Sequence, residues 1–393
     1  MNLKQALLAI LLLPVVAQAQ SYRAPTLDPA EDEQRIGSID RNGALFWGPE
    51  DKVVGFRNIE RIAPTRRIQG ADEALELPLS LQDLGSVPID LGGETMTLDE
   101  YFEAHHTAGL LVIQDGEILY ERYGLGNTAD SRWVSFSVAK SVVAMLIGAA
   151  IQDGYIESVD EKVADYLPRL AGSPYSETSI ENLLQMASGV EWNEDYADPN
   201  SDVATASWET IALYDFLNDK ARVAPAGEKF NYNTAETNLA GTLLRAAIGN
   251  NLSTYLEDKV WKPFGMESDA YWQLTEPAGG EFGGCCINAT LRDYGRLGMF
   301  ALADGVLADG TRVLPEGWMA ASTEPSPGYE GYGYFWWLNP DDTYSASGIF
   351  GQGIYIAPEK NLVIAVHSAW EHAGRGEDFE RLQKVYDAIA EQL

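Results

Sequence analysis

The feature that most constrains the fold is residues 137–152, whose apolar spacing predicts a helix without a polar face. Its apolar side chains fall on every side of the helix: Val138, Val142, Val143, Met145, Leu146, Ile147 and Ile151. A helix of this kind has no side suited to water, so it belongs in the centre of a protein. With 393 residues, the chain is long enough to surround it, and we expect one compact body of two lobes.

Strand patterns occur on both sides of this helix in the sequence. Residues 110–113 and 118–120 predict a hairpin that turns at Asp115-Gly116. The remaining expected elements are helices at 180–186, 238–248 and 292–302, strands at 332–338, 353–357 and 362–367, and a C-terminal amphipathic helix. This order predicts an α+β fold, in which helices flank an antiparallel sheet built from both ends of the chain. An all-helical lobe is inserted between these ends.

The N-terminal residues have the pattern of an export signal. Lys4 is followed by an apolar run too short to span a bilayer and by the small-x-small site Ala17-Gln18-Ala19. A buried N-terminal helix is the alternative. We expect a signal peptide at 1–19, cleavage near Ala19, and a periplasmic or secreted protein without a membrane span. The other expected parts are a leader at 20–95 and a domain at 96–393, with its α/β part at 96–160 and 290–393 and its helical lobe at 161–289.

The net charge of −32 argues against nucleic acid and anionic lipid as partners, because phosphate binding needs clustered Lys and Arg. The two cysteines, Cys285 and Cys286, are neighbours. Two separate buried thiols are the preferred interpretation, and a strained vicinal disulfide is the alternative. The four histidines have no metal-ligand spacing, so we expect no metal and no cofactor. The oligomeric state stays open.

Ser137 and Lys140 open the apolar helix, and residues three apart share one face of a helix. A serine hydroxyl becomes a good nucleophile only when a base removes its proton. Burial disfavours the charged form of lysine, so a buried Lys140 could supply that base. The helix N-terminus would favour negative charge developing on Ser137. A lysine that only extends its stem along the helix is the alternative interpretation.

Several motifs in order along residues 96–393 resemble the serine β-lactamase and penicillin-binding superfamily. The motifs are Phe136-Ser137-Val138-Ala139-Lys140-Ser141, Ile180-x-x-Leu183-Leu184-x-Met186-x-Ser188-Gly189, Pro225-x-Gly227-x-x-Phe230-x-Tyr232-Asn233-Thr234, Asn288-Ala289-Thr290-x-x-Asp293 and Gly348-x-x-Gly351-Gln352. The first resembles the opening motif of class C β-lactamases, D-Ala-D-Ala carboxypeptidases, family-VIII esterases and 6-aminohexanoate-dimer hydrolases. The resemblance implies the β-lactamase/transpeptidase-like fold.

The resemblance also implies roles for individual residues. Ser137 would be the acylated nucleophile, Lys140 its base, and Tyr232 a phenol of lowered pKa that shuttles the proton. The N–H groups of Ser137 and Ile349 would form the oxyanion hole. Substrate contacts would come from Tyr196, Thr234, Asn288, Ser347 and Gly348.

Two departures from the β-lactamase pattern bear on the substrate. Thr234 stands where class C enzymes have Asn in Tyr-x-Asn, and Ala346-Ser347-Gly348 stands where they have Lys-Thr-Gly. Losing the lysine removes an anchor for an anionic substrate. The motifs are more like those of 6-aminohexanoate-dimer hydrolases and family-VIII esterases. The loop around Tyr196 adds to this, although a solvated acidic loop explains it equally well.

These patterns predict a hydrolase of small-molecule esters or amides, with a β-lactamase or D-Ala-D-Ala carboxypeptidase as the alternative. A non-enzymatic penicillin-recognition or peptidoglycan-binding module is a third reading. A Ser-His-Asp hydrolase is less favoured because the chain lacks a Gly-x-Ser-x-Gly elbow. His367 falls in a strand pattern and is not expected to be the base.

Overall fold

A six-stranded antiparallel sheet forms the centre of the α/β part. Its strands, in spatial order, are β5 (Glu117–Tyr123), β4 (Thr107–Gln114), β12 (Leu362–Ser368), β11 (Gly353–Ala357), β10 (Tyr344–Ser347) and β9 (Trp337–Leu338). This computed structural model describes residues 22–40 and 43–393. β4 pairs with β12, so both halves of the sequence build one sheet, and the expected α+β class is confirmed.

The sheet is covered on both faces, and its side chains alternate between two cores. Leu111 and Ile113 of β4 pack in the core that contains the central helix, whereas Leu110 and Val112 pack in a second core. A strand buried on both faces reads as a continuous apolar run, which explains the run at 110–113. The alternation has period two because successive strand side chains point to opposite faces.

Two helices cover these two faces. They are α12 (Leu291–Leu302) and α14 (Glu377–Gln392). Gly298 lets α12 approach the sheet, since a Cβ there would lie 2.4 Å from Val363 Cγ1. On the other face, Tyr386 of α14 stacks on Tyr355 of β11 with ring centroids 4.7 Å apart. The central helix α5 (Val138–Gln152) is buried along nearly all its length, as its sequence predicts.

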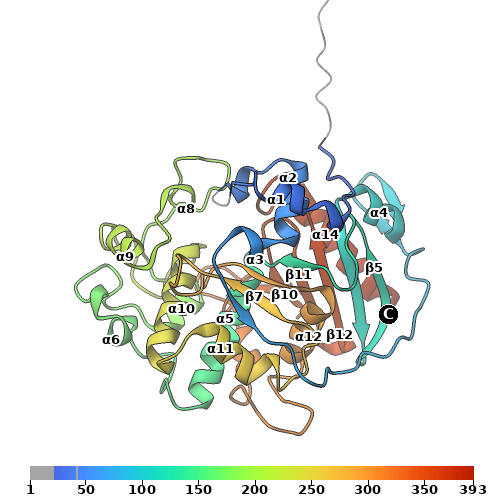
Figure 1. The fold of residues 1–393 in the computed structure, drawn as a ribbon. Coiled ribbons are helices and arrows are strands. Elements are labelled where there is room, and N and C mark those ends of the chain that lie inside the picture. Colours follow the sequence, from blue (N-terminus) through green and yellow to red (C-terminus); the bar gives the residue numbers. More distant parts are fainter. Residues whose placement is uncertain (1–21, 41–42) are drawn as a thin grey trace, which may run out of the picture.

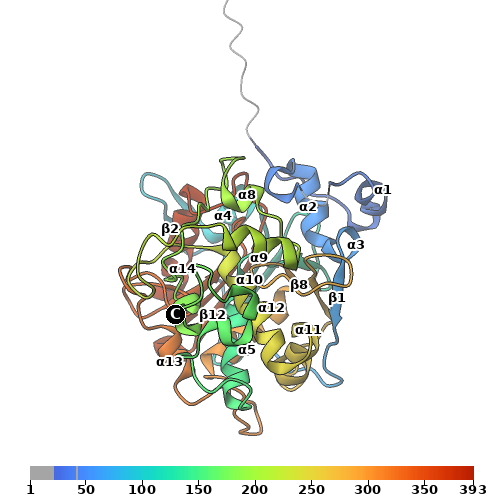
Figure 2. The same cartoon turned by 90° about the vertical axis from the view of Figure 1, so that its left-hand side faces the viewer.

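A helical region lies beside the sheet (Figures 1 and 2). Its helices are α6 (Val163–Tyr166), α7 (Ile180–Leu184), α8 (Asp202–Thr205), α9 (Thr210–Asn218), α10 (Thr234–Ile248) and α11 (Leu252–Leu256). The range 161–289 is not entirely helical, which corrects that expectation. β7 (Ala270–Gln273) and most of β8 (Ile287–Thr290) fall in it, and they join β1 (Thr65–Ile68) and β6 (Arg132–Val134) in a four-stranded sheet. Strands of four residues are too short to show a clear period.

The segment before residue 96 contains regular elements that pack against the body. They are α1 (Glu33–Ile36), α2 (Pro49–Arg57), α3 (Ile59–Ile62), β1, β2 (Pro88–Asp90) and β3 (Thr95–Thr97), followed by α4 (Leu98–Ala104). Lys52 of α2 is buried, and its Nζ donates to the carbonyl of Trp370 at 2.9 Å. This contact ties α2 to the loop between β12 and α14.

The structure differs from one further expectation. Only residues 337–338 of the expected strand at 332–338 are extended, and α13 (Trp318–Ser322) precedes this segment. Phe335 interrupts the strand because its φ is +60°, which is left-handed backbone. The expected signal peptide lies outside the described residues. Within the part of the chain that is described, no helix is long and apolar enough to cross a membrane.

Candidate active site

Ser137 lies where β6 passes into α5. It stands at the N-cap of the helix, is 8% exposed, and directly follows Phe136. Phe136 has a φ of +43°, a conformation that costs a non-glycine residue roughly 1–3 kcal/mol. Residues in such conformations cluster at functional sites. This bend places Ser137 at the N-terminus of α5, a helix that is otherwise buried.

Lys140 is buried one helical turn beyond Ser137. Its Nζ lies 3.1 Å from Ser137 Oγ and 2.8 Å from the carbonyl oxygen of Gly284. Burial lowers the pKa of Lys140 to about 8, and the nearby carboxylate of Glu194 partly opposes this effect. The amine is therefore neutral in about a tenth of molecules at pH 7, a fraction that rises with pH. A neutral amine at this distance can accept the hydroxyl proton.

Tyr232 lies on a loop that contacts a neighbouring loop at two points. Asn231 N donates to Met186 O at 2.7 Å. Gly189 has a φ of +76°, and a Cβ there would lie 2.1 Å from Ala224 O, so only glycine lets the two loops meet. These contacts explain why the Ser188-Gly189 and Pro225-x-Gly227 motifs occur together in the sequence.

The Tyr232 ring centroid lies 5.4 Å from Lys140 Nζ. We expected a phenol of lowered pKa, and the structure corrects this. Burial raises the pKa of Tyr232, and the Glu194 carboxylate raises it further, whereas interaction with Ser137 partly lowers it. Tyr232 therefore keeps its proton at neutral pH and can donate it, whereas Lys140 is the group able to accept one.

The two backbone N–H groups expected to form an oxyanion hole flank the nucleophile. Neither Ser137 N nor Ile349 N donates to an acceptor within the described residues. Gly348, which precedes Ile349, lies so close to the nucleophile strand that a Cβ would be 2.6 Å from Ser135 O. A glycine is needed at this position for the approach of the two chain segments. Both N–H groups remain available to a substrate oxygen.

Two cavities adjoin in this region, and Ser137 lines one of them. The first, about 370 Å³, is lined by Tyr232, Ser347 and Gly348 together with charged side chains. The second, about 430 Å³, is lined by Ser137 itself and mainly by apolar side chains. Tyr196 and Ile349 line both, so they mark the boundary. A substrate bound at Ser137 therefore has room on two chemically different sides.

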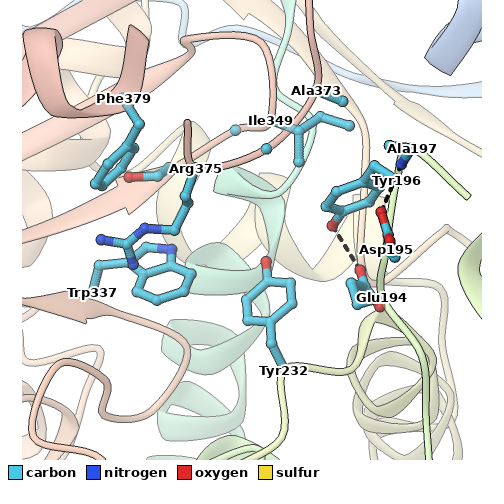
Figure 3. A pocket seen from close by; sticks show the side chains of 13 residues that line it. Glu194, Asp195, Tyr196, Ala197, Tyr232, Trp337, Ile349, Ala373, Arg375 and Phe379 are labelled. Atoms are coloured by element: carbon cyan, nitrogen blue, oxygen red, sulfur yellow. Dashed lines mark hydrogen bonds between the residues drawn. The ribbon is translucent and has the colours of Figure 1, made fainter. Parts of the chain in front are cut away.

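Glu194 connects the residues around the first cavity. Its carboxylate accepts a hydrogen bond from the Tyr196 hydroxyl at 2.6 Å (Figure 3). It also accepts one from the Thr234 backbone N–H at 3.0 Å. The Thr234 hydroxyl and the Trp192 indole also donate to it. Thr234 is thus engaged with Glu194 while lining the second cavity. Glu194 was not among the expected site residues, because one acid in an acidic loop carries no distinguishing signal.

Arg375 is a second residue that sequence reasoning missed. Its guanidinium lies 3.7 Å from the Trp337 ring centroid and 3.9 Å from that of Phe379, and it lines the first cavity (Figure 3). Arg375 comes from the loop before α14, where no strand or helix pattern indicates its position. The missing third-motif lysine therefore does not leave this cavity without a cation. The sequence feature that could have drawn attention to Arg375 is its position between two glycines in an acidic chain.

One further expectation for the site, the placement of Asn288, is corrected. Asn288 lines neither cavity, since β8 directs its side chain towards Glu60, to which its Nδ2 donates. His367 is buried against Trp133 and Tyr294, and burial lowers its pKa to about 3, so it remains neutral. Among residues 22–40 and 43–393, no cluster of His, Cys, Asp and Glu could hold a metal ion.

The cysteines also differ from the preferred interpretation. Cys285 and Cys286 are joined in a vicinal disulfide rather than remaining separate thiols. Both line the second cavity, next to the Gly284 carbonyl that accepts the Lys140 hydrogen bond. Because the two cysteines are adjacent in the sequence, both separate thiols and a disulfide were possible.

Comparison with known proteins identifies the family. Residues 97–387, well over half of the chain, match the family described as Beta-lactamase. The chain belongs to this family. It is also 30% identical, over 298 residues, to the 6-aminohexanoate-dimer hydrolase of Paenarthrobacter ureafaciens, covering 70% of this chain and 75% of the relative. The family members named by these matches are hydrolases, so this chain is a hydrolase of the β-lactamase fold.

Solved structures show the same fold. The structure named "Putative 6-aminohexanoate-dimer hydrolase from Bacillus anthracis" matches with a TM-score of 0.81 and 22% identity, covering 91% of this chain and 97% of the other. A family VIII carboxylesterase matches with a TM-score of 0.57 and 18% identity, covering 74% and 95%. Together with the family match and the 30% identical relative, this agreement confirms the expected superfamily.

Proposed function

We propose that this β-lactamase-family protein is a serine hydrolase that cleaves an ester or amide bond through an acyl-enzyme on Ser137. The observation that carries the proposal is the 3.1 Å contact between Lys140 Nζ and Ser137 Oγ in a buried site. Burial lowers the pKa of that amine to about 8, so the neutral base is accessible near neutral pH. A nucleophile, a base and a proton donor then share one site, as acyl transfer needs.

The proposed reaction begins when Lys140 Nζ takes the Ser137 proton and Oγ attacks the carbonyl carbon. Negative charge on the carbonyl oxygen is stabilised by the N–H groups of Ser137 and Ile349. As the tetrahedral intermediate collapses, the bond to the leaving group breaks and the Tyr232 phenol gives the leaving atom a proton. Lys140 then returns its proton to Tyr232. In the second half, water attacks the carbonyl carbon of the acyl-enzyme and gives a proton to Tyr232, which passes its own proton to Lys140. Lys140 then protonates Ser137 Oγ as the bond between Oγ and the acyl carbon breaks, which releases the acid and restores Ser137.

For the substrate class, we propose esters or linear amides, as in the 6-aminohexanoate-dimer hydrolase and carboxylesterase relatives. β-Lactams remain a second candidate because Arg375 lines the first cavity and could bind their carboxylate. The comparison of p-nitrophenyl butyrate with nitrocefin separates the two. We expect a higher kcat/KM for the ester, and faster nitrocefin hydrolysis would reverse this ranking.

We also propose that the protein is exported, on the strength of the pattern at residues 1–19 alone. Expression of the full chain in a bacterium, followed by N-terminal sequencing of the periplasmic fraction, tests this. Cleavage near Ala19 is expected. Full-length protein found only in the cytoplasm would contradict the proposal.

The central experiment is labelling with a fluorophosphonate probe combined with ester hydrolysis. We expect the wild-type protein to be labelled and Ser137→Ala to lose both labelling and turnover. Ser141→Ala is the matched control, because this serine lies on the same helix but donates to the Phe335 carbonyl. Turnover retained in Ser137→Ala would end the proposal, and an unlabelled, inactive wild-type protein would favour a binding module.

A further inference from the structure

The second cavity has a chemical character that the proposed reaction does not by itself require. It opens on Ser137, and its volume of about 430 Å³ lies in the range of small-molecule sites. Among residues 22–40 and 43–393, no Lys, Arg, Asp or Glu lines it. The first cavity, in contrast, is lined by Glu194, Asp195 and Arg375.

The position of Tyr232 decides which part of a substrate enters which cavity. Tyr232 lines the first cavity and not the second, whereas Ser137 lines the second. A leaving group that needs a proton must depart within reach of the proton donor. It therefore departs into the first cavity, and the acyl group that remains bonded to Ser137 occupies the second.

Part of the second cavity is built by residues outside the matched family region. Residues 44–46 and Ile59 belong to the N-terminal segment, whereas the family match begins at residue 97. Phe46 is 63% exposed, which is unusual for a large aromatic side chain, and it stands at the wall of this cavity. The segment that contains Phe46 is tied to the body by Arg57, whose Nη1 donates to Asn127 Oδ1 at 3.1 Å.

We propose that the second cavity is an acyl-binding site for uncharged, apolar acyl groups, and that the N-terminal segment sets its length selectivity. The inference rests on the proposed hydrolase function. Apolar walls stabilise a longer alkyl chain by removing it from water. A terminal ammonium or carboxylate would lose its hydration in this cavity without meeting an opposite charge.

The experiment measures kcat/KM for p-nitrophenyl acetate, butyrate and hexanoate, and for the 6-aminohexanoate and hemiadipate esters. Removing a methylene from water supports an increase of up to about fourfold per carbon. We expect hexanoate to exceed acetate by at least tenfold and both charged esters to fall below hexanoate by a similar factor. A flat series, or a charged ester as good as hexanoate, would overturn the inference.

A blocking variant connects the selectivity to the cavity. Ala204 lines it and is half-buried, so Ala204→Phe adds a ring that can enter the cavity without displacing the core. This variant should lower the ratio of hexanoate to acetate at least fivefold, whereas Ala171→Phe, at an exposed position, should leave the ratio as in the wild type. Phe46→Ala should change the same ratio, because it alters the wall from the N-terminal segment.

The two proposals fail in different ways. If Ser137→Ala retains ester hydrolysis, the serine mechanism fails, and the acyl site fails with it. If hydrolysis depends on Ser137 but Ala204→Phe and Phe46→Ala both keep the wild-type ratio, only the acyl-site assignment fails. Thermal unfolding of each variant identifies any loss that comes from misfolding, and a folded variant with an unchanged ratio counts against the inference.

Discussion

The protonation of Lys140 leads to a quantitative prediction, because only the neutral amine can accept the Ser137 proton. With a pKa of about 8, Lys140 is neutral in about a tenth of molecules at pH 7 and in about nine tenths at pH 9. We therefore expect kcat/KM for p-nitrophenyl butyrate to rise about tenfold between these values, with a midpoint near 8. The assay subtracts spontaneous hydrolysis at each pH.

Glu194→Gln tests whether the electrostatic account of this midpoint is right. The Glu194 carboxylate holds the pKa of Lys140 up against burial, so removing its charge should lower the midpoint. A fall of roughly one pH unit is the low end of the effect of a neighbouring opposite charge. It would raise the neutral fraction of Lys140 at pH 7 about fivefold. Glutamine keeps the shape of the side chain, so the cavity is preserved.

Asp195→Asn is the matched control, because it removes a carboxylate from the adjacent position of the same loop. Glu194 is the one charge that raises the pKa of Lys140, so the control should keep the wild-type midpoint. A wild-type profile that is flat from pH 6 to 9 would refute the assignment of Lys140 as base. A midpoint that does not move in Glu194→Gln would refute the electrostatic role of that carboxylate.

Three further predictions concern the proton donor, the oxyanion strand and a buried acid. Tyr232→Phe should lower kcat/KM about a hundredfold for alkyl esters but much less for p-nitrophenyl esters, whose leaving group departs without a proton; equal losses would argue against general acid catalysis. Gly348→Ala should lower kcat at least tenfold, because its Cβ would meet Ser135 O at 2.6 Å. An unchanged kcat would show that activity does not require this close approach of the two chain segments. Burial raises the pKa of Glu236 to about 8. Between about pH 5 and 8 the folded protein therefore holds a proton that the unfolded chain releases. The free energy of unfolding should fall as the pH rises through this range. Urea unfolding should find Glu236→Gln more stable than the wild type by roughly 1–3 kcal/mol at pH 8, and an equal pH dependence in both proteins would contradict this reasoning.

The sequence predicted the parts of the fold that depend on local patterns. The central helix is apolar on every side, and the contact of Ser137 with Lys140 follows from a spacing of three residues on that helix. The hairpin of β4 and β5 has strong strand patterns and a clear turn. In each case the residues that determine the structure are neighbours in the sequence.

Other parts could not be predicted because they depend on residues far apart in the chain. The raised pKa of Tyr232 arises from burial and from Glu194, which lies on a different loop. Arg375 enters the first cavity from the loop before α14. Asn288 was misplaced because a motif match does not fix which face of a short strand a residue occupies, and a shift of one residue reverses the face.

The same burial prepares the candidate base and the candidate acid in opposite ways. Removal from water disfavours charge, so it lowers the pKa of the Lys140 amine and raises that of the Tyr232 phenol. Burial thereby keeps the proton on Tyr232 and brings the neutral form of Lys140 within reach of neutral pH, so one group can donate a proton and the other can accept one. Glu194 raises both pKa values, so it retains the proton on Tyr232 while limiting the supply of neutral Lys140. Its removal should therefore favour activation of Ser137 at low pH and weaken the hold of Tyr232 on its proton. One carboxylate thus sets the balance between attack and departure of the leaving group.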